Sequence, residues 1–180
     1  MREEIILVDP YDHEIGTCEK ITAHRERRLH RAFSLFVTDG SGSLLIQRRA
    51  AGKYHSAALW CNACCSHPRK GELLPEAVSR RAAEELGISA FPLGEPEEMF
   101  SFVYYADYGE LAEYEYDHVF LARLGRDTVF HPDPEEIGEL TWISFSALER
   151  ALLEHPYRVT AWFLTTAPRV MAMLRGGQAG

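Results

Sequence analysis

The sequence contains few lysines. Only three of its 19 basic residues are lysines, and 27 acidic residues bring the formal net charge at pH 7 to -8. Such a chain lacks the broad basic surface that binds nucleic acid. A small anionic ligand is still compatible with this charge if basic side chains gather locally, as they do in the segment QRRAAGK, residues 47–53.

Long apolar runs are also missing. The opening residues, MREEIILVDP, reach charge and proline within a few positions, and no run approaches the roughly 18 apolar residues of a membrane span. We therefore expect a soluble, cytoplasmic protein with no membrane partner. With 180 residues, 46% of them hydrophobic, the chain can bury one sizeable core. The lack of repeats and linkers predicts a single domain over residues 1–180.

Cysteines are too sparse for a disulfide-stapled scaffold. The chain has four, and Cys64 and Cys65 are adjacent, where a mutual bridge would be strained. Reduced thiols are therefore expected. Cys61 and Cys64 form a C-x-x-C pair, but no second pair follows, which disfavours a structural zinc ribbon. The stretch CNACCSHP, residues 61–68, remains the densest group of reactive side chains in the sequence.

The spacing of apolar and turn residues predicts a mixed α/β (α+β) protein. Strands are expected at residues 5–8 and 14–20, as a pair within 33–49 around a turn at 39–42, and at 100–106, 113–124 and 139–145. Helices are expected at residues 73–88, 146–155 and 157–174. Pro168 favours a break in the last of these helices.

Three histidines and two glutamates have the side chains of a metal site. The residues are His24, His30, His67, Glu113 and Glu115. Imidazoles and carboxylates suit a divalent transition metal such as zinc or manganese. Residues two apart in a strand share a face, so both glutamates of the predicted strand can point at one centre. Taken singly, each residue is equally compatible with a surface or core position, because the chain has eight histidines.

Charged residues in the predicted helix 73–88 follow a recognisable spacing. Arg80 and Arg81 precede Glu84 and Glu85 by four positions, which is typical of ion pairs on an exposed helix. Residues 66–88 also resemble the box of the Nudix superfamily, G-x5-E-x7-R-E-U-x-E-E-x-G-U, where U is aliphatic. The matching residues are Glu72, Arg80, Glu84, Glu85, Gly87 and Ile88.

The box is degenerate at two positions. Ser66 stands at the first glycine, and Arg81 stands where a glutamate is expected. In Nudix hydrolases that glutamate belongs to the carboxylates that hold metal for pyrophosphate cleavage. The resemblance therefore implies a Nudix-like mixed sheet flanked by helices, while Arg81 disfavours hydrolysis.

The chain resembles the type I isopentenyl diphosphate isomerases almost from end to end. The matching blocks, in order, are EKITAHRERRLHRAFS, LLIQRRAAGKYHSAALW, NACCSHP, RRAAEELGI, YEYDHVF and TAW. HSAALW replaces the WPGVW type of segment found in some members. The resemblance implies an isomerase that interconverts isopentenyl and dimethylallyl diphosphate through a tertiary carbocation and supplies isoprenoid biosynthesis.

The resemblance also implies a role for each site residue. Cys65 and Glu115 match the catalytic cysteine and glutamate, Tyr104 the tyrosine beside that glutamate, and Trp162 the tryptophan that stabilises the cation. Basic contacts to the diphosphate are implied for Lys20, Arg49, Lys53 and Arg81. Mg2+ would join the diphosphate to Glu85 and the backbone carbonyl of Cys65, while Mn2+ or Zn2+ would occupy the His/Glu site.

Two other functions are compatible with parts of the sequence. One is a Nudix hydrolase acting on nucleoside diphosphate derivatives, against which Arg81 counts. The other is a non-catalytic, metal-stabilised binding domain in which the histidines, with Cys61 and Cys64, are structural ligands. Under the isomerase interpretation those two cysteines are packing residues, the partner is a small diphosphate, and the protein is a monomer or a weak homodimer.

Overall fold

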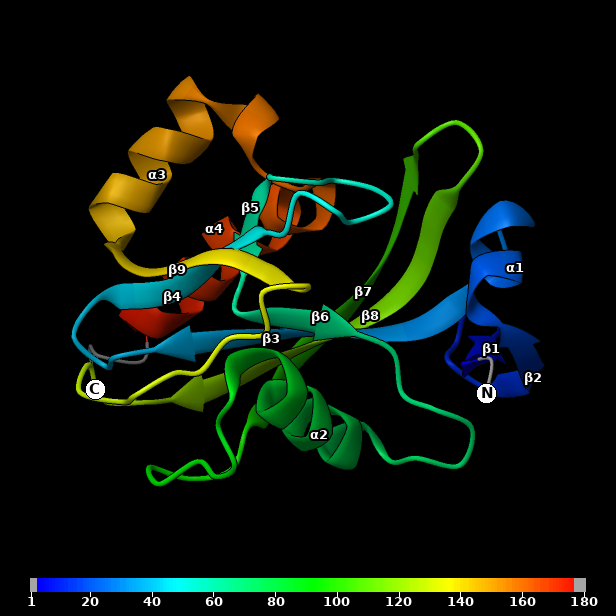
Figure 1. Cartoon of the computed structure of the whole chain (residues 1–180), viewed down its shortest axis with the longest axis horizontal. Coiled ribbons are helices and arrows are strands. Elements are labelled where there is room, and N and C mark those ends of the chain that lie inside the picture. The colour runs from blue at the N-terminus through cyan, green and yellow to red at the C-terminus, as the bar shows by residue number, and fades with distance from the viewer. Residues whose placement is uncertain (1–2, 177–180) are drawn as a thin grey trace.

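The structure is a computed structural model that describes residues 3–176, and its strands form one mixed sheet (Figure 1). The strands are β1 (Glu4–Val8), β2 (Glu14–Glu19), β3 (His30–Thr38), β4 (Ser43–Arg49), β5 (Trp60–Asn62), β6 (Cys64–Ser66), β7 (Glu97–Asp107), β8 (Ala112–Arg123) and β9 (Ile137–Ser144). The helices are α1 (Lys20–Arg25), α2 (Leu74–Leu86), α3 (Phe145–Glu154), the 3-10 turn η1 (Pro156–Arg158) and α4 (Ala161–Gly176). The predicted mixed α/β class is confirmed.

At the centre of the sheet, β3 runs parallel to β8. The register pairs His30 with Glu115 at one end and Thr38 with Arg123 at the other. A parallel pair needs a long crossover connection, and the chain between β3 and β8 includes α2. β7 pairs antiparallel with β8 and sets Tyr104 opposite Glu115. The register therefore brings three predicted site residues onto neighbouring strands.

The other edge of β3 is shared by three strands. β1 pairs with its start, where Leu7 lies opposite His30, and β4 pairs with its end. β6 pairs with the middle of β3 and sets Cys65 opposite Ser34. The short strand β6 therefore carries Cys65 to the centre of the sheet.

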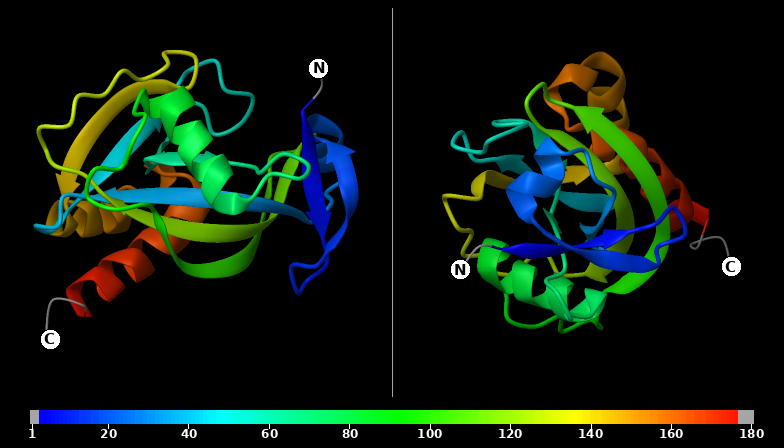
Figure 2. Two further views of the ribbon diagram at one scale, coloured as in Figure 1. Left: turned by 90° about the horizontal axis from the view of Figure 1, so that it is seen from below. Right: turned by 90° about the vertical axis from the view of Figure 1, so that its right-hand side faces the viewer.

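Apolar side chains pack on both faces of the sheet. One core, which includes Leu35 of β3, lies between the sheet and α2, and the other, which includes Phe36, lies between the sheet and α3 and α4. Figure 1 shows α2 below β3 and β8, with α3 and α4 above, and Figure 2 shows the same layers from two more sides. Because successive strand residues face opposite sides, Cys64 joins the first core and Cys65 packs against the second.

Helix α2 begins and ends at the residues that its sequence favours. Pro75 lies in the first turn, and the carboxylate of Glu76 accepts a hydrogen bond from the N–H of Leu73 at 3.2 Å. Gly87 ends the helix in the left-handed conformation, at φ +69°. The predicted helix is confirmed, with bounds of Leu74–Leu86.

Some short elements escaped the sequence pattern. β5 and β6 have three residues each, too few for an alternation of apolar and polar residues to be recognised, and α1 has six. The strand predicted for residues 14–20 ends one residue early, because α1 begins at Lys20. Over three to six residues, the spacing of apolar residues does not distinguish a helix from a strand.

Helix α4 differs from its prediction in two ways. It begins at Ala161, after η1, and not at residue 157, and it continues through Pro168 without the expected break. Pro168 and Leu164, whose carbonyl loses its helical partner, both lie on the exposed face, where water can donate the missing hydrogen bond. Within residues 3–176, no helix has both the length and the apolar character needed to cross a membrane.

The substitution Gly87→Ala should destabilise the fold more than its backbone angle alone requires. A Cβ atom at this position would lie 2.4 Å from the backbone oxygen of His131. We expect the free energy of unfolding, measured by urea denaturation, to fall by about 2 kcal/mol or more.

Gly71→Ala is the matched control. Gly71 has a similar φ of +76°, but a Cβ atom added there would meet no other part of the described chain within 4 Å. Its loss should be only about 1 kcal/mol, the cost of the left-handed conformation. Equal losses in the two variants would show that the contact with His131 carries no weight.

Candidate active site

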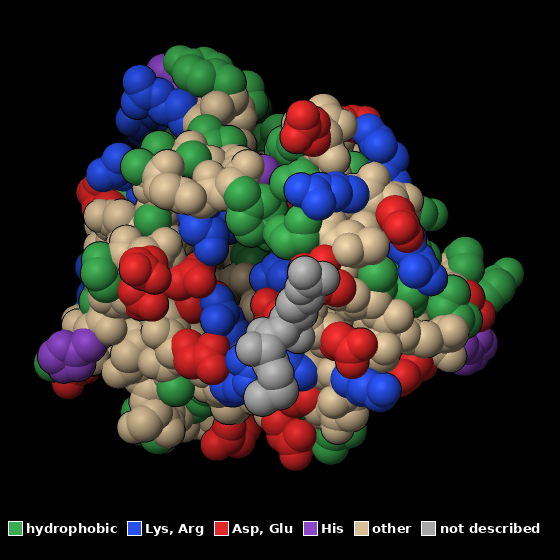
Figure 3. All heavy atoms as spheres, turned by 45° about the vertical axis from the view of Figure 1, so that its right-hand side comes forward, with side chains coloured by type: hydrophobic (Ala, Val, Ile, Leu, Met, Phe, Trp, Pro, Cys, Tyr) green, Lys and Arg blue, Asp and Glu red, His purple; other side chains and the backbone are tan. Residues whose placement is uncertain are grey.

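A pocket of about 60 Å3 lies beside the β3–β8 pair and collects most of the predicted site residues. Ten of them line it: Lys20, Arg49, Lys53, Cys65, His67, Arg81, Tyr104, Glu113, Glu115 and Trp162. Figure 3 shows the molecule hollowed near the centre of this face, with Lys and Arg side chains around the hollow. The three other predicted residues, His24, His30 and Glu85, lie outside this lining.

Four of the predicted metal ligands form one buried cluster. One ligand atom from each of His24, His30, His67 and Glu115 lies within 4.8 Å of all the others, and each residue is at most 6% exposed. His24 comes from α1, His30 begins β3, and His67 follows β6 directly. The β3–β8 register then sets Glu115 beside His30.

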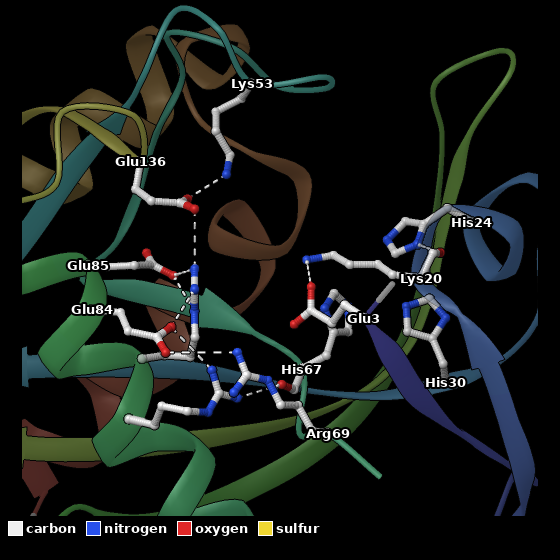
Figure 4. A network of polar contacts seen from close by, with 12 residues as sticks. Glu3, Lys20, His24, His30, Lys53, His67, Arg69, Glu84, Glu85 and Glu136 are labelled. Carbon is white, nitrogen blue, oxygen red and sulfur yellow. Dashed lines mark hydrogen bonds and ion pairs between the residues drawn. The ribbon is translucent and has the colours of Figure 1, made fainter. Parts of the chain in front are cut away.

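The histidine nitrogens have the arrangement of a metal site. Nδ1 of His24 donates to the backbone oxygen of Lys20 at 2.7 Å, and Nδ1 of His30 donates to that of Arg28 at 2.8 Å. Nε2 of His24 and Nδ1 of His67 are buried without a hydrogen-bond partner among the described residues, and Nε2 of His30 has only a long contact with Glu115, at 3.5 Å. Such unpaired nitrogens are costly in a core, and a carbonyl that fixes the opposite nitrogen is usual for metal-binding histidines. The cluster, whose three histidines are labelled in Figure 4, therefore fits a divalent metal.

Burial also keeps the imidazoles of His24 and His67 in the form that binds metal. It lowers the pKa of His24, helped by the charge of His30, and it lowers the pKa of His67 well below the usual value. Neutral imidazole has a free lone pair, whereas imidazolium has none. The cluster is therefore ready to bind a cation at pH 7.

Glu113 lies outside this four-residue cluster. Its carboxylate oxygens lie 3.1 Å from Nε2 of His55 and accept hydrogen bonds from the hydroxyls of Tyr104, at 3.1 Å, and Tyr108, at 3.2 Å. Glu113 and Glu115 both contact Tyr104, so the two carboxylates are neighbours. The role of Glu113 as a metal ligand stays a prediction.

The carboxylate of Glu115 is held from two sides. The hydroxyl of Tyr104 donates to it at 2.5 Å, and Nε2 of His67 donates to its other oxygen at 2.9 Å. Although burial opposes ionisation, the contacts with His30 and His67 keep the pKa of Glu115 well below its usual value. Burial and repulsion from Glu115 raise the pKa of Glu113. The pair therefore favours negative charge on Glu115.

The thiol of Cys65 belongs to a fixed hydrogen-bond array. Sγ donates to Oδ1 of Asn62 at 3.0 Å, and Nε1 of Trp162 lies 3.1 Å from both of these atoms. The Asn62 amide nitrogen donates to the carbonyls of Leu35 and Cys64, at 3.1 and 2.8 Å. These two carbonyls fix the orientation of the amide, and the amide oxygen in turn orients the thiol and the indole.

The thiol is un-ionised at neutral pH. Burial, together with the neighbouring Cys61 thiol, raises the pKa of Cys65 well above its usual value. The hydroxyl of Ser34 lies 3.7 Å from Sγ and donates to Asp117 at 2.7 Å, so no cation contacts the sulfur from that side. The site thus combines a protonated thiol on β6 with the ionised Glu115 two strands away.

Lys53 and Arg81 are paired with carboxylates, and Figure 4 shows the pair of Lys53 with Glu136. Nζ of Lys53 lies 2.5 Å from Glu136, and the guanidinium of Arg81 contacts Glu85, Glu84 at 2.7 Å and Glu136 at 3.4 Å. Burial raises the pKa of Glu85, although Arg81 opposes this shift. Both cations line the pocket, so an incoming anion would have to compete with these partners.

The two other predicted cations differ in their pairing. Lys20 lies 3.4 Å from a carboxylate oxygen of Glu3. Arg49 donates to the backbone oxygen of His55 at 3.4 Å, its Nε is buried without a partner in the described chain, and its guanidinium carbon lies 5.5 Å from the centre of the Trp162 ring. Arg49 therefore keeps an unused donor beside the indole.

Arg80 braces the loop that carries His67. Its guanidinium makes two bonds to the carboxylate of Glu72, at 2.6 and 2.8 Å, and approaches the backbone oxygen of His67 at 3.5 Å. It also makes the predicted ion pair with Glu84, at 3.2 Å. The Glu72–Arg80 pair, which fits the spacing of the Nudix box, thus fixes the loop next to the buried His/Glu cluster.

Sequence reasoning missed three polar residues of the site. Asn62, His55 and Glu136 come from short strands and loops, where no periodicity marks an inward-facing side chain. Asn62 had one signal, its place three residues before Cys65 in the block NACCSHP. His55 and Glu136 had none beyond their residue type.

Replacing His67 with alanine should weaken metal binding by about a hundredfold or more, since even the loss of an outer hydrogen bond to a ligand costs 10–100-fold. Competition with a chromogenic chelator, followed by metal analysis of the dialysed protein, measures the affinity for Zn2+ and Mn2+.

His13→Ala serves as the control, because His13 is exposed and contacts Asp9 outside the cluster. We expect this variant to bind the metal as tightly as the unaltered protein. Equal affinities in His67→Ala and His13→Ala would mean that the buried cluster is not the metal site.

Known proteins are similar to this chain in sequence and in fold. A NUDIX domain model matches residues 28–163. The chain is 44% identical over 164 residues to isopentenyl-diphosphate Delta-isomerase 2 of Photorhabdus laumondii subsp. laumondii, covering 91% of this chain and 89% of that protein. It is also 44% identical over 164 residues to isopentenyl-diphosphate Delta-isomerase of Burkholderia multivorans, covering 91% of this chain and 90% of that protein.

Among solved structures, the fold is similar to DR0079 from Deinococcus radiodurans, with a TM-score of 0.74 at 22% identity, covering 93% of this chain and 98% of that one. The MutT protein from Methanosarcina mazei Go1 has a TM-score of 0.61 at 19% identity, over 84% and 96% of the two chains. These likenesses confirm the Nudix-like fold. Together with the identity to curated relatives over most of the chain, they establish that the protein belongs to the Nudix superfamily and, within it, to the isopentenyl-diphosphate Delta-isomerase family.

Proposed function

We propose that this protein interconverts isopentenyl and dimethylallyl diphosphate and so supplies isoprenoid biosynthesis. The observation that carries the proposal is the pocket itself, in which the un-ionised thiol of Cys65 and the ionised carboxylate of Glu115 line one small space with Trp162. Relatives that carry the name of this isomerase support it. The reaction moves a double bond by adding one proton and removing another, so it needs two such groups.

Cys65 and Glu115 are the proposed proton-transfer groups. Protonation of the terminal carbon of isopentenyl diphosphate gives a tertiary carbocation, and loss of a proton from the carbon nearer the diphosphate gives dimethylallyl diphosphate. One of the two groups donates and the other accepts, and their roles exchange in the reverse direction. Tyr104 holds the Glu115 carboxylate by its 2.5 Å hydrogen bond and would stabilise whichever form the step leaves.

Trp162 is the proposed stabiliser of the carbocation. Its ring lines the pocket and is 2% exposed, and its Nε1–H is fixed by Asn62 and Cys65. A cation over a desolvated indole face gains about 2 kcal/mol. Bound substrate that displaces water from the pocket would also keep water from capturing the cation.

The diphosphate is proposed to bind Lys20, Arg49, Lys53 and Arg81, which all line the same pocket. Arg49 has a buried Nε to offer that lacks a partner within the described chain. Lys53 and Arg81 would exchange Glu136 and Glu85 for phosphate oxygens. Guanidinium groups suit phosphate because they present two parallel donors.

Two metal sites complete the proposal. The first takes Mn2+ or Zn2+, and its proposed ligands are His24, His30, His67, Glu113 and Glu115. Bound there, the metal would withdraw charge from Glu115 and fix its orientation. The second takes Mg2+ with the diphosphate, at Glu85 and the backbone carbonyl of Cys65. Glu85 has the hard oxygen donors that Mg2+ prefers and is 3% exposed.

Replacing Cys65 with alanine or Glu115 with glutamine should lower turnover by about a thousandfold or more, since proton transfer by a positioned group contributes 10²–10⁴. Exchange of label between the two C5 diphosphates in the presence of Mg2+ measures this activity. Cys64→Ala is the control, because Cys64 packs into the core on the opposite face of β6.

Retained turnover in both Cys65→Ala and Glu115→Gln would reject the assigned mechanism. A parallel assay of phosphate release from nucleoside diphosphate derivatives tests the hydrolase alternative. Chelation that unfolds a protein inactive on both substrate classes would instead indicate a metal-stabilised binding domain.

Asn62→Ala should lower kcat about ten- to a hundredfold with little change in KM, because the thiol and the indole lose a shared acceptor. The Trp162 indole resonance, assigned through Trp162→Phe, should shift in a 15N–1H spectrum. Gln47→Ala is the control: this buried amide donates to the Ala63 backbone at 3.0 Å but stays out of the pocket lining. A similar fall of kcat in Asn62→Ala and Gln47→Ala would show that Asn62 contributes to packing only and does not orient the thiol and the indole.

A further inference from the structure

His55 occupies an unexpected place for a loop residue. It lies in the segment between β4 and β5, residues 50–59, yet it is only 8% exposed. Its imidazole points into the site and contacts Glu113 at 3.1 Å. In Figure 1 this segment, drawn in cyan, extends toward the β7–β8 hairpin.

Three aromatic rings surround the imidazole. Tyr108 of the β7–β8 turn stacks on it, with centroids 4.9 Å apart and planes at 21°. Tyr54 meets it edge-on at 4.6 Å, and Trp162 meets it edge-on at 6.2 Å. Tyr108 also donates to Glu113, so His55, Tyr108 and Glu113 form a closed set of mutual contacts.

The hairpin that receives His55 is itself held in place. Arg27 donates to the hydroxyl of Tyr105 at 3.0 Å and to the backbone oxygen of Gly109 at 3.0 Å, and it pairs with Asp107 at 3.3 Å. The turn that carries Tyr108 is therefore tied to the segment after α1. It offers the 50–59 segment a fixed surface.

Two residues of the 50–59 segment have a strained backbone. Ser56 and Ala58 adopt left-handed conformations, at φ +50° and +60°, without being glycine. Such conformations persist only where surrounding contacts enforce them. The buried contacts of His55, directly before Ser56, act here together with the hydrogen bond from the Leu59 N–H to the Ser56 carbonyl, at 3.3 Å.

The same segment carries Lys53 and directly follows Arg49, and these are two of the four cations proposed for the diphosphate. The guanidinium of Arg49 donates to the backbone oxygen of His55 at 3.4 Å. The backbone N–H of Arg49 donates to the backbone oxygen of Leu59, at the far end of the segment, at 2.9 Å. Lys53 lies in its first turn.

We propose that His55 is a positioning residue that pins the 50–59 segment against the β7–β8 hairpin, and thereby sets Arg49 and Lys53 for the diphosphate and closes the pocket beside Trp162. The inference rests on the proposed function for its substrate. It concerns the placing of the cations and not the proton transfers, so it predicts an effect on substrate binding above all.

The test compares His55→Ala with the unaltered protein in two assays. The KM for isopentenyl diphosphate should rise about tenfold or more, while kcat changes by less than about threefold. Trypsin should cut the Lys53–Tyr54 bond about tenfold faster in the folded variant, because the segment opens more often. His55→Phe keeps the stacking on Tyr108 but loses the contact with Glu113, and should give intermediate values in both assays.

His155→Ala is the matched control, since His155 is exposed and faces Tyr157 at 5.8 Å, outside the pocket lining. It should leave KM and cleavage unchanged. An unaltered KM and cleavage rate in His55→Ala would overturn the inference, as would a fall of kcat at constant KM. If His55→Ala fails to fold, His55→Phe decides by the same two measurements.

The two proposals fail in distinguishable ways. A protein that turns over neither C5 diphosphate contradicts the proposed function, while the tryptic assay still decides whether His55 holds the segment. If the protein is an active isomerase, and His55→Ala changes neither KM nor the rate of tryptic cleavage, only the inference about His55 is contradicted.

Discussion

The hydrogen-bonded register between β3 and β8 is the constraint on which the site depends. It sets His30 beside Glu115, and the β7–β8 register adds Tyr104 on the next strand. A slip of one residue would turn Glu115 to the opposite face of the sheet and separate it from the histidines. Because β6 pairs with the same strand β3, that register also fixes where Cys65 lies relative to Glu115. Fold and site are therefore specified by the same backbone bonds.

Buried charge is the second constraint. The pocket holds several carboxylates and cations in a small volume, and an uncompensated buried charge is far more costly than a paired one. Glu85 with Arg81, Glu136 with Lys53, and Glu115 with its histidines show how the chain meets that cost. Two of the three lysines in a chain of net charge -8 line this pocket. Residues that serve the site are thus also needed to keep the fold stable.

Much of this architecture could be predicted from the sequence, and the reasons differ by element. α2 and the long strands have enough residues for periodicity and terminal signals to be clear, whereas β5 and β6 do not. The resemblance to a family identified Cys65 and the histidines, but no spacing reveals which atoms meet. The contacts that turn Glu113 toward Tyr108, and the burial of His55, arise only when distant segments pack. Pro168 is the opposite case, because its residue type predicts a helix break. The helix continues nevertheless, since Pro168 lies on its exposed face.

The pairing of Lys53 and Arg81 with carboxylates has a consequence for selectivity. Lys53 and Arg81 each have a carboxylate partner already. The binding free energy of an anion is therefore only the difference between the new ion pair and the one that it replaces. A lone phosphate gains little by that exchange, since it leaves unbalanced charge on the buried Glu85 and on the partly buried Glu136. Under the proposed function, a diphosphate that arrives with its own divalent cation would supply a partner both for the basic residues and for the carboxylates. These ion pairs would then favour a ligand by its arrangement of positive and negative charge and not by its total charge.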